Sequence, residues 1–93
     1  MTTRVLLIDD HELIRQGLAR AFERDDEMTV VGQAGSVAEG VKTYADLEPD
    51  VVVTDLELPD GHGLDVVRQV RQTSDAVGVG VALPPDAQGE LHA

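Results

Sequence analysis

Three aspartates stand directly after short apolar segments of the chain. Asp9 and Asp10 follow the run RVLLI at residues 4–8, and Asp55 follows VVVT at residues 51–54. Close carboxylates repel one another and need a counter-charge, which a hard cation such as Mg²⁺ supplies through oxygen ligands. A carboxylate beside that cation can itself attack phosphorus and form an aspartyl phosphate. If the two segments are neighbours, these residues predict a Mg²⁺ site with a reactive carboxylate.

A helix cap is the alternative explanation for each aspartate. Asp is a favoured N-cap residue, so capping explains Asp9 or Asp10 taken singly as well as function does. Capping accounts poorly for an adjacent pair together with a third aspartate after another strand, so the cation site is preferred for the group. His11 follows the pair and is interpreted as an exposed residue that starts the next helix, rather than as a ligand. His62 is also interpreted as exposed.

The elements that would position these acids alternate along the chain between strand and helix. Continuous apolar runs bounded by polar residues predict four strands, at 4–8, 29–34, 51–54 and 77–83. Apolar residues at three- and four-residue spacing predict three helices, at 12–24, from 36 to just before Pro49, and around 64–71. Residues 56–62 are predicted to form a turn-rich loop.

The helices carry more detailed predictions. The apolar residues expected to face the core are, in the first helix, Leu13, Ile14, Leu18, Ala21 and Phe22, and in the last helix, Leu64, Val67 and Val70. Ser36 and Glu39 match a capping box, in which the Ser36 hydroxyl accepts from the Glu39 N–H. The Glu39 carboxylate then accepts from the N–H of Ser36.

The order of these elements predicts the fold class. Strands that alternate with single helices form a parallel sheet, and right-handed crossovers place helices on both of its faces. We therefore expect an α/β fold, a three-layer doubly wound parallel sheet with about four strands and three helices. Function in such sheets collects outside the carboxyl ends of the strands, where Asp9, Asp10 and Asp55 stand.

Composition limits the classes of function open to the chain. Its 93 residues suffice for one small domain, whose core must be built from Val, Leu, Ile and Ala because there are one Phe, one Tyr and no Trp. Eighteen acids against seven bases give a net charge of −11, which argues against nucleic-acid binding by these residues. The absence of cysteine excludes disulfides and thiolate metal sites. With no membrane-length apolar run and no signal-peptide pattern, a cytoplasmic protein is expected.

The stretches VLLIDDHELIRQGLARAFE and VVVTDLELPDGHGLDVVRQVR strongly resemble the receiver domain of bacterial two-component response regulators. The resemblance covers about residues 4–71 and is greatest to the subfamily usually joined to a C-terminal helix-turn-helix. It implies a flavodoxin-like fold, Mg²⁺ as cofactor and a sensor histidine kinase as phosphoryl donor. By position, it implies that Asp55 is the phosphoacceptor and that Pro59 and Gly63 shape the pocket loop. The residues implied to hold Mg²⁺ are Asp10 directly, Asp9 usually through water, Asp55 itself and Glu57 through its backbone carbonyl.

The departures from the receiver pattern come after Arg71. The family places a Ser or Thr at the end of the fourth strand, near residues 83–85 here, and a Lys at the end of a fifth strand; neither is present, and the only lysine is Lys42. The expected organisation is a truncated receiver at 1–83, without the fifth strand and last helices, and a tail without clear structure at 84–93. Phosphorylation is expected to be slow, and the switching output to be lost. An open edge on the fourth strand predicts a homodimer or an exchange of elements between two copies.

Other functions fit the residues less well. Halo-acid-type phosphatases need DxDx(T/V) after the first strand, where this chain has IDDH at residues 8–11, and folds of the topoisomerase–primase type need Glu there. The chain is therefore not expected to be an enzyme beyond its own phosphorylation on Asp55. Two alternatives stay open: a non-phosphorylated interaction module that binds a kinase or a regulator, and a fragment of a longer DNA-binding response regulator.

Overall fold

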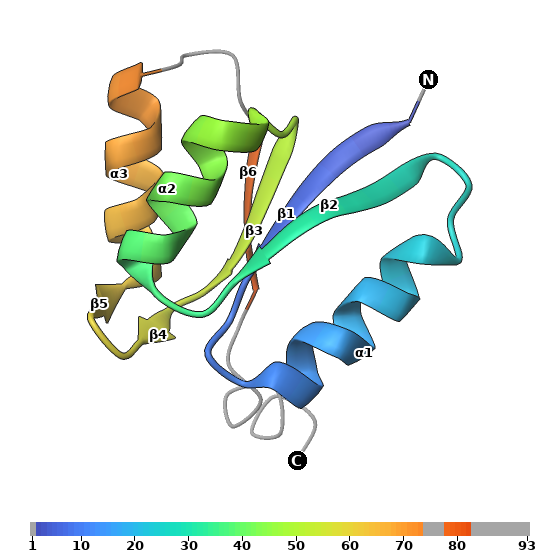
Figure 1. Cartoon of the computed structure of the whole chain (residues 1–93), viewed down its shortest axis with the longest axis horizontal. Coiled ribbons are helices and arrows are strands. Elements are labelled where there is room, and N and C mark those ends of the chain that lie inside the picture. Colours follow the sequence, from blue (N-terminus) through green and yellow to red (C-terminus); the bar gives the residue numbers. More distant parts are fainter. Residues whose placement is uncertain (1, 74–77, 83–93) are drawn as a thin grey trace.

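A four-stranded parallel sheet forms the centre of the computed structural model, which describes residues 2–73 and 78–82 (Figure 1). Its strands are β1 (Thr3–Ile8), β2 (Met28–Ala34), β3 (Val51–Asp55) and β6 (Gly78–Ala82), in the order β2-β1-β3-β6. The helices are α1 (Glu12–Glu23), α2 (Val37–Leu47) and α3 (Gly63–Thr73). Each neighbouring pair of strands is parallel. The predicted alternation of strand and helix is confirmed.

Helices cover both faces of the sheet, and the residues of β1 are buried alternately on the two sides. Leu6 and Ile8 belong to a core shared with α2 and α3, whereas Val5 and Leu7 belong to a second core with Ala19 of α1. Figure 1 shows α2 and α3 together on one side of the sheet and α1 on the other. The fold is therefore the three-layer doubly wound arrangement that a continuous apolar strand requires.

The core-facing residues predicted for two helices are only partly right. Leu13 of α1 is 81 % exposed, and the buried residue of that helix is Ala19. In α3, Leu64 is exposed, while Val66 and Val70 are fully buried. A helix rich in apolar residues offers two neighbouring rows at helical spacing, and contact with the sheet selects between them.

Residues 56–62 are more ordered than the predicted loop. They contain β4 (Glu57–Leu58) and β5 (Gly61–His62), which pair antiparallel as a short hairpin. Leu58 is buried in the core shared with α2 and α3, so the hairpin is anchored to the body of the domain. Strands of two residues are too short for alternation to reveal them in a sequence.

The N-terminus of α2 differs from the predicted capping box in one contact. The Ser36 Oγ atom accepts from the Glu39 N–H at 3.1 Å, as predicted. The Glu39 carboxylate accepts from the N–H of Gly35 at 3.2 Å, and not from that of Ser36. The carboxylate thus reaches one residue further back than in the standard box.

The C-terminal predictions are only partly covered by the described residues. The fourth predicted strand is observed as β6, while Val77, Leu83 and the tail at 84–93 lie outside the described residues. The expected domain boundary after Leu83 therefore lies outside the described residues and stays a prediction. None of the helices in the described part of the chain is long and apolar enough to cross a membrane.

Candidate metal centre

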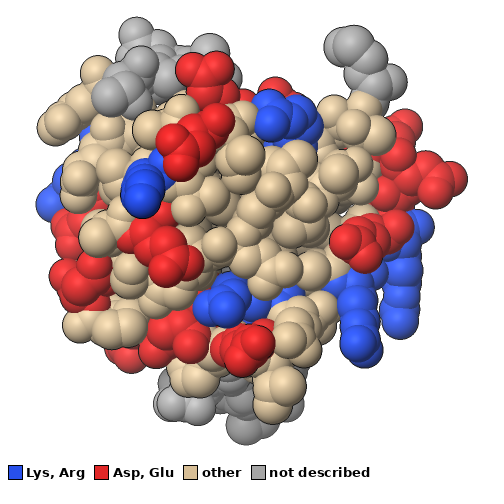
Figure 2. Space-filling view, viewed as in Figure 1, with Lys and Arg blue, Asp and Glu red and all other residues tan. Residues whose placement is uncertain are grey.

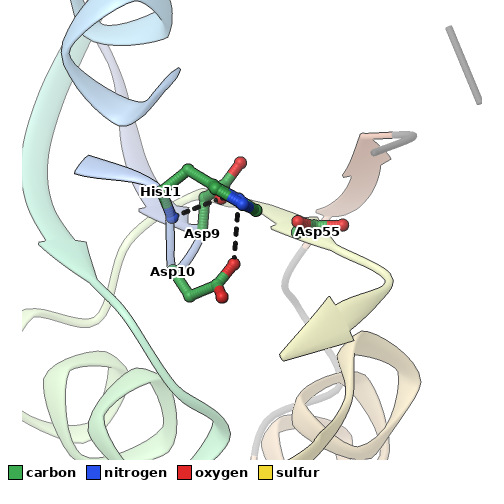
Figure 3. Close-up of side chains that lie close together, drawn as sticks. All are labelled: Asp9, Asp10, His11 and Asp55. Carbon is green, nitrogen blue, oxygen red and sulfur yellow. Dashed lines mark hydrogen bonds and ion pairs between the residues drawn. The ribbon is translucent and has the colours of Figure 1, made fainter. Parts of the chain in front are cut away.

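Three carboxylates and one imidazole meet at the carboxyl ends of β1 and β3. Asp9, Asp10 and His11 follow β1 directly, and Asp55 is the last residue of β3. One ligand atom from each side chain lies within 4.8 Å of the others. Figure 3 shows the four side chains gathered at these two strand ends. The parallel pairing of Ile8 with Thr54 brings the two acidic segments together.

Asp9 is the most firmly held of the acids that follow β1. It is 5 % exposed, and its N–H donates to the carbonyl of Ala34 in β2 at 2.9 Å. Its Oδ1 atom accepts from the N–H of His11 at 2.8 Å, and its carbonyl accepts from the guanidinium of Arg15. Arg15 thus places a cation beside the cluster, a contact that the sequence did not suggest.

Neither Asp9 nor Asp10 caps α1. The residue at the N-cap position is His11, and its side chain makes no capping hydrogen bond. The capping explanation considered for these two aspartates therefore fails for the helix that follows them.

Asp55 is buried at the centre of the cluster, with 3 % of its surface exposed. Its Oδ1 atom accepts from the N–H of Glu57 at 3.3 Å. Burial raises the pKa of the Asp55 carboxyl above its ordinary value, and the charges of Asp9 and Asp10 raise it further, against the lowering effect of the Glu57 N–H. A carboxylate in this setting is stabilised by any cation that binds beside it.

His11 contributes the nitrogen of the cluster. Its Nδ1 atom lies 3.0 Å from Asp10 Oδ1 and 3.2 Å from Asp9 Oδ1. The hydrogen bond to Asp9 raises the pKa of His11, and the charge of Asp10 raises it further. The side chain is 60 % exposed, as expected from the sequence, but its direction toward the acids was not predicted.

The hairpin after β3 packs its backbone closely against the cluster. Glu57 lies in β4, and its carboxylate is not among the converging ligand atoms of the described residues. The resemblance to receiver domains implies that its backbone carbonyl is the ligand instead. The N–H of Gly63 donates to the carbonyl of Leu56 at 2.8 Å. A Cβ atom on Gly63 would overlap the carbonyl oxygen of Asp55, so a glycine is required there for space.

Asp60, at the tip of the hairpin, is a structural residue that the sequence did not identify. Its carboxylate accepts from the N–H groups of Val37 at 2.7 Å and Ala38 at 3.0 Å, at the start of α2. These backbone bonds, that of Ala38 foremost, lower the pKa of Asp60. The loop that follows Asp55 is thereby joined to a neighbouring helix.

The donor set fits a hard divalent cation. Three carboxylates offer the oxygen ligands that Mg²⁺ prefers, and one or two of them suffice because Mg²⁺ usually keeps several waters. Two of the three, Asp9 and Asp55, are buried, so their charges are poorly solvated and benefit most from a cation. The residues of the cluster are therefore compatible with Mg²⁺.

Comparison with known proteins gives consistent results. The family model described as "Response regulator receiver domain" matches residues 5–82. The DNA-binding transcriptional activator DevR/DosR of Mycobacterium tuberculosis is 46% identical over 67 residues, which is 72% of this chain and 31% of that protein. The transcriptional regulatory protein LiaR of Bacillus subtilis is 42% identical over 73 residues, 77% of this chain and 35% of that protein. The chain thus spans about a third of the length of these curated relatives.

Solved structures give the same fold. A two-component response regulator of the LuxR family from Aurantimonas is similar with a TM-score of 0.85 and 33% identity, over 97% of this chain and 66% of that one. The response regulator domain of Thermotoga maritima CheB is similar with a TM-score of 0.84 and 28% identity, over 89% of this chain and 61% of that one. Both are receiver-type, flavodoxin-like structures.

Proposed function

The chain belongs to the response regulator receiver domain family, and from that membership we propose that Asp55 accepts a phosphoryl group beside a Mg²⁺ ion. The observation that carries the proposal is the convergence of Asp9 and Asp10 on the buried Asp55 at the carboxyl ends of two neighbouring strands. The general role of such domains is in two-component signalling, and the relatives named above are regulators of transcription.

Each residue of the cluster has a distinct proposed role. Asp10 would hold Mg²⁺ directly, Asp9 would act through water, and Glu57 would contribute its backbone carbonyl. An Asp55 carboxylate oxygen attacks phosphorus, and the bond from phosphorus to the donor atom breaks as the acyl phosphate forms. A bound Mg²⁺ neutralises charge on the transferred group. The low exposure of Asp55 limits the access of water to the product.

The proposed donor in the cell is a phosphohistidine of a sensor histidine kinase. Lys42, the single lysine of these 93 residues, is exposed on α2 rather than beside the cluster. The receiver pattern places a lysine at the end of a fifth strand, where its positive charge stabilises the phosphoryl group. A cation in that position lowers the barrier to phosphoryl transfer by a few kcal/mol. We therefore expect acceptance of the phosphoryl group by residues 1–93 to be slow and the switching output to be impaired.

Intact-mass spectrometry tests the phosphoacceptor directly. The chain is incubated with acetyl phosphate and Mg²⁺, and one added phosphoryl group is expected. The adduct should be lost in Asp55→Asn and in EDTA, and kept in Asp46→Asn, which changes an exposed carboxylate of α2. A folded wild-type chain that gains no adduct would contradict the proposal and favour a non-phosphorylated interaction module.

A second part of the proposal concerns self-association through β6. This strand pairs with β3, and within residues 2–73 and 78–82 no strand pairs with its other edge. An unpaired edge is a template for another strand, and a second copy of the chain offers one. Light scattering should show a dimer that forms with rising concentration; a monomer at the highest concentration would contradict this.

A further inference from the structure

Arg15 of α1 reaches back to the peptide group that joins Asp9 to Asp10. Its guanidinium Nη1 atom donates to the carbonyl oxygen of Asp9, which belongs to that peptide group. We propose that Arg15 is a positioning residue of the cation site, which fixes the direction in which the Asp10 side chain leaves the end of β1. The inference rests on the proposed function, in which Asp10 would hold Mg²⁺ directly, and it places Arg15 outside the set of metal ligands.

Two elements outside the acidic cluster hold the guanidinium in place. Arg15 lies near the start of α1, and its backbone N–H donates to the carbonyl of His11 at 3.0 Å. Its Nε atom donates to the Oε1 atom of Gln33, in β2, at 3.3 Å. Because Nε and Nη1 belong to one planar group, the contact with Gln33 orients Nη1 toward Asp9. The half-buried side chain therefore connects α1 and β2 with the end of β1.

The backbone of Asp9 is held on both sides. Its N–H donates to the carbonyl of Ala34 in β2 at 2.9 Å, and its carbonyl accepts from Arg15. A peptide group is planar, so fixing the Asp9 carbonyl also fixes the place of the Asp10 Cα atom. The Asp10 side chain is 34 % exposed, and its direction therefore depends on the backbone from which it projects.

The turn after β2 leaves space for the guanidinium. A Cβ atom on Gly35 would lie 3.2 Å from the Arg15 Nη1 atom and 3.9 Å from the Asp9 carbonyl oxygen. The first distance is shorter than an ordinary van der Waals contact, so a side chain at residue 35 would displace the arginine. Gly35, the Gln33 amide and the Asp9 carbonyl thus surround one guanidinium group.

The charge of Arg15 and its position have opposite effects on a bound cation. A positive charge beside a cation site, acting alone, weakens binding by repulsion. The guanidinium contacts a carbonyl, and within the described residues it forms no ion pair with Asp9, Asp10 or Asp55. Mg²⁺ demands near-ideal geometry, and residues that orient its ligands typically change metal affinity by about 10- to 100-fold. Removal of Arg15 should therefore weaken Mg²⁺ binding if Arg15 positions Asp10, and tighten it if only the charge matters.

A Mg²⁺ titration of the full chain, followed by ¹H–¹⁵N NMR, separates these two effects. Arg15→Met should raise the Kd for Mg²⁺ by about tenfold. Arg15→Lys keeps the charge but lacks the planar fork, so it should raise the Kd by less. Arg20→Met is the matched control, because Arg20 is an exposed arginine of the same helix, and it should leave the Kd nearly unchanged. Methionine, lysine and arginine have similar helix propensities, so none of these substitutions disfavours α1.

The metal-free chain provides a readout of the contact itself. The Asp10 amide nitrogen belongs to the peptide group that accepts from Arg15, so its ¹⁵N resonance responds when that hydrogen bond is lost. The resonance should shift in Arg15→Met and stay in place in Arg20→Met, both without Mg²⁺. An Asp10 resonance that Arg15→Met leaves unmoved would overturn the inference. Circular dichroism checks that each variant is folded, and Arg15→Lys replaces Arg15→Met in both measurements if the latter does not fold.

Phosphorylation by acetyl phosphate distinguishes positioning from a general loss of stability. Arg15→Met should need more Mg²⁺ to reach half of its maximal initial rate, and its rate at saturating Mg²⁺ should approach that of the wild type. An unchanged Mg²⁺ requirement, or a Kd equal to or lower than that of the wild type, would overturn the role of Arg15 and leave the proposed function intact. A folded wild-type chain that binds no Mg²⁺ would instead overturn the proposed function.

Discussion

Gly63 stands where the chain leaves the hairpin and turns back against the end of β3. A Cβ atom there would overlap the carbonyl oxygen of Asp55 and lie 3.0 Å from its carbonyl carbon. Both obstacles are backbone atoms, which move only if the acceptor segment moves. Gly63→Ala is expected to lower the free energy of unfolding by about 1–3 kcal/mol, as measured by urea denaturation.

Gly17 is the matched control for that substitution. It lies within α1, and a Cβ atom there would meet nothing within 4 Å. Alanine is favoured over glycine in a helix interior by about 1 kcal/mol, so Gly17→Ala should stabilise the chain. If the two alanine variants were equally stable, the close packing assigned to Gly63 would be wrong.

Asp55 carries a pH dependence whose sign follows from burial. Its folded pKa is raised, mainly by burial and then by Asp9 and Asp10, so its contribution to stability is full below about pH 4 and is lost as the pH rises through the folded pKa. Asp55→Asn should therefore raise the unfolding midpoint at pH 7 in EDTA. Each 1 kcal/mol corresponds to roughly 4–8 °C in a domain of this size.

Calorimetry at pH 7 and pH 4 measures the effect of Asp55. The advantage of Asp55→Asn should shrink at the lower pH, because the wild-type carboxyl is then increasingly protonated. Asp46→Asn, on the exposed face of α2, controls for the general loss of one negative charge. A variant at Asp55 that is less stable than the wild type at pH 7 would contradict the assignment of an unfavourable buried carboxylate.

At the scale of the elements, Asp60 joins the hairpin to α2. Its carboxylate accepts from Ala38 and Val37, and those bonds lower its pKa. A depressed folded pKa contributes stability above the unfolded pKa, and that stability is lost as the pH falls through the folded value. Asp60→Ala should therefore lower the unfolding midpoint at pH 7, and the difference from wild type should vanish well below pH 4.

Thermal unfolding followed by circular dichroism checks the role of Asp60. Asp46→Ala is the control, because Asp46 lies on α2 itself. The substitution removes an equal charge without removing a hydrogen bond to the start of α2. Equal effects of the two substitutions, or a difference that persists at low pH, would show that Asp60 does not act through the helix terminus.

Elements with strong local signals were predictable, and those fixed by tertiary contacts were not. The run at residues 4–8 ends at two aspartates, so β1 was clear from sequence, and Ser36 marked the start of α2. The buried positions of α3 were not clear, because Leu64, Val66 and Val67 fit two neighbouring rows. Contact with the sheet decides between those rows, and no local pattern encodes it.

The contacts of the candidate site fall into the same two groups, those predictable from local sequence and those fixed by tertiary contacts. The three carboxylates were predictable from the sequence, because each is a charged residue directly after an apolar strand, and the parallel sheet brings them together. The ring direction of His11 depends on the backbone angles of one residue. The contact of Arg15 with the Asp9 carbonyl depends on where α1 lies against β2, and the bonds from Asp60 depend on a hairpin of two-residue strands. Such contacts follow from the assembled fold.

At the scale of the whole molecule, the charge of −11 opposes the compact state through self-repulsion. Figure 2 shows Asp and Glu distributed around the visible face rather than gathered in one patch. Sodium chloride should therefore stabilise the chain modestly, by screening. Mg²⁺ at matched ionic strength should stabilise it further, because binding at a site adds RT ln(1 + [L]/Kd), about 2.7 kcal/mol at a hundredfold excess over Kd.

Asp10→Asn separates the two contributions of added salt. Asp10 lies at the partly exposed edge of the cluster, so its substitution removes a proposed ligand without opening the core. Calorimetric scans in NaCl and in MgCl₂ of equal ionic strength should differ for the wild type and agree for Asp10→Asn. The stabilisation by charge screening should remain in both proteins, because Asp10→Asn removes only one of the eighteen acidic charges. Equal stabilisation of the wild type by the two salts would mean that Mg²⁺ acts only on the diffuse surface charge and not at the carboxyl ends of β1 and β3.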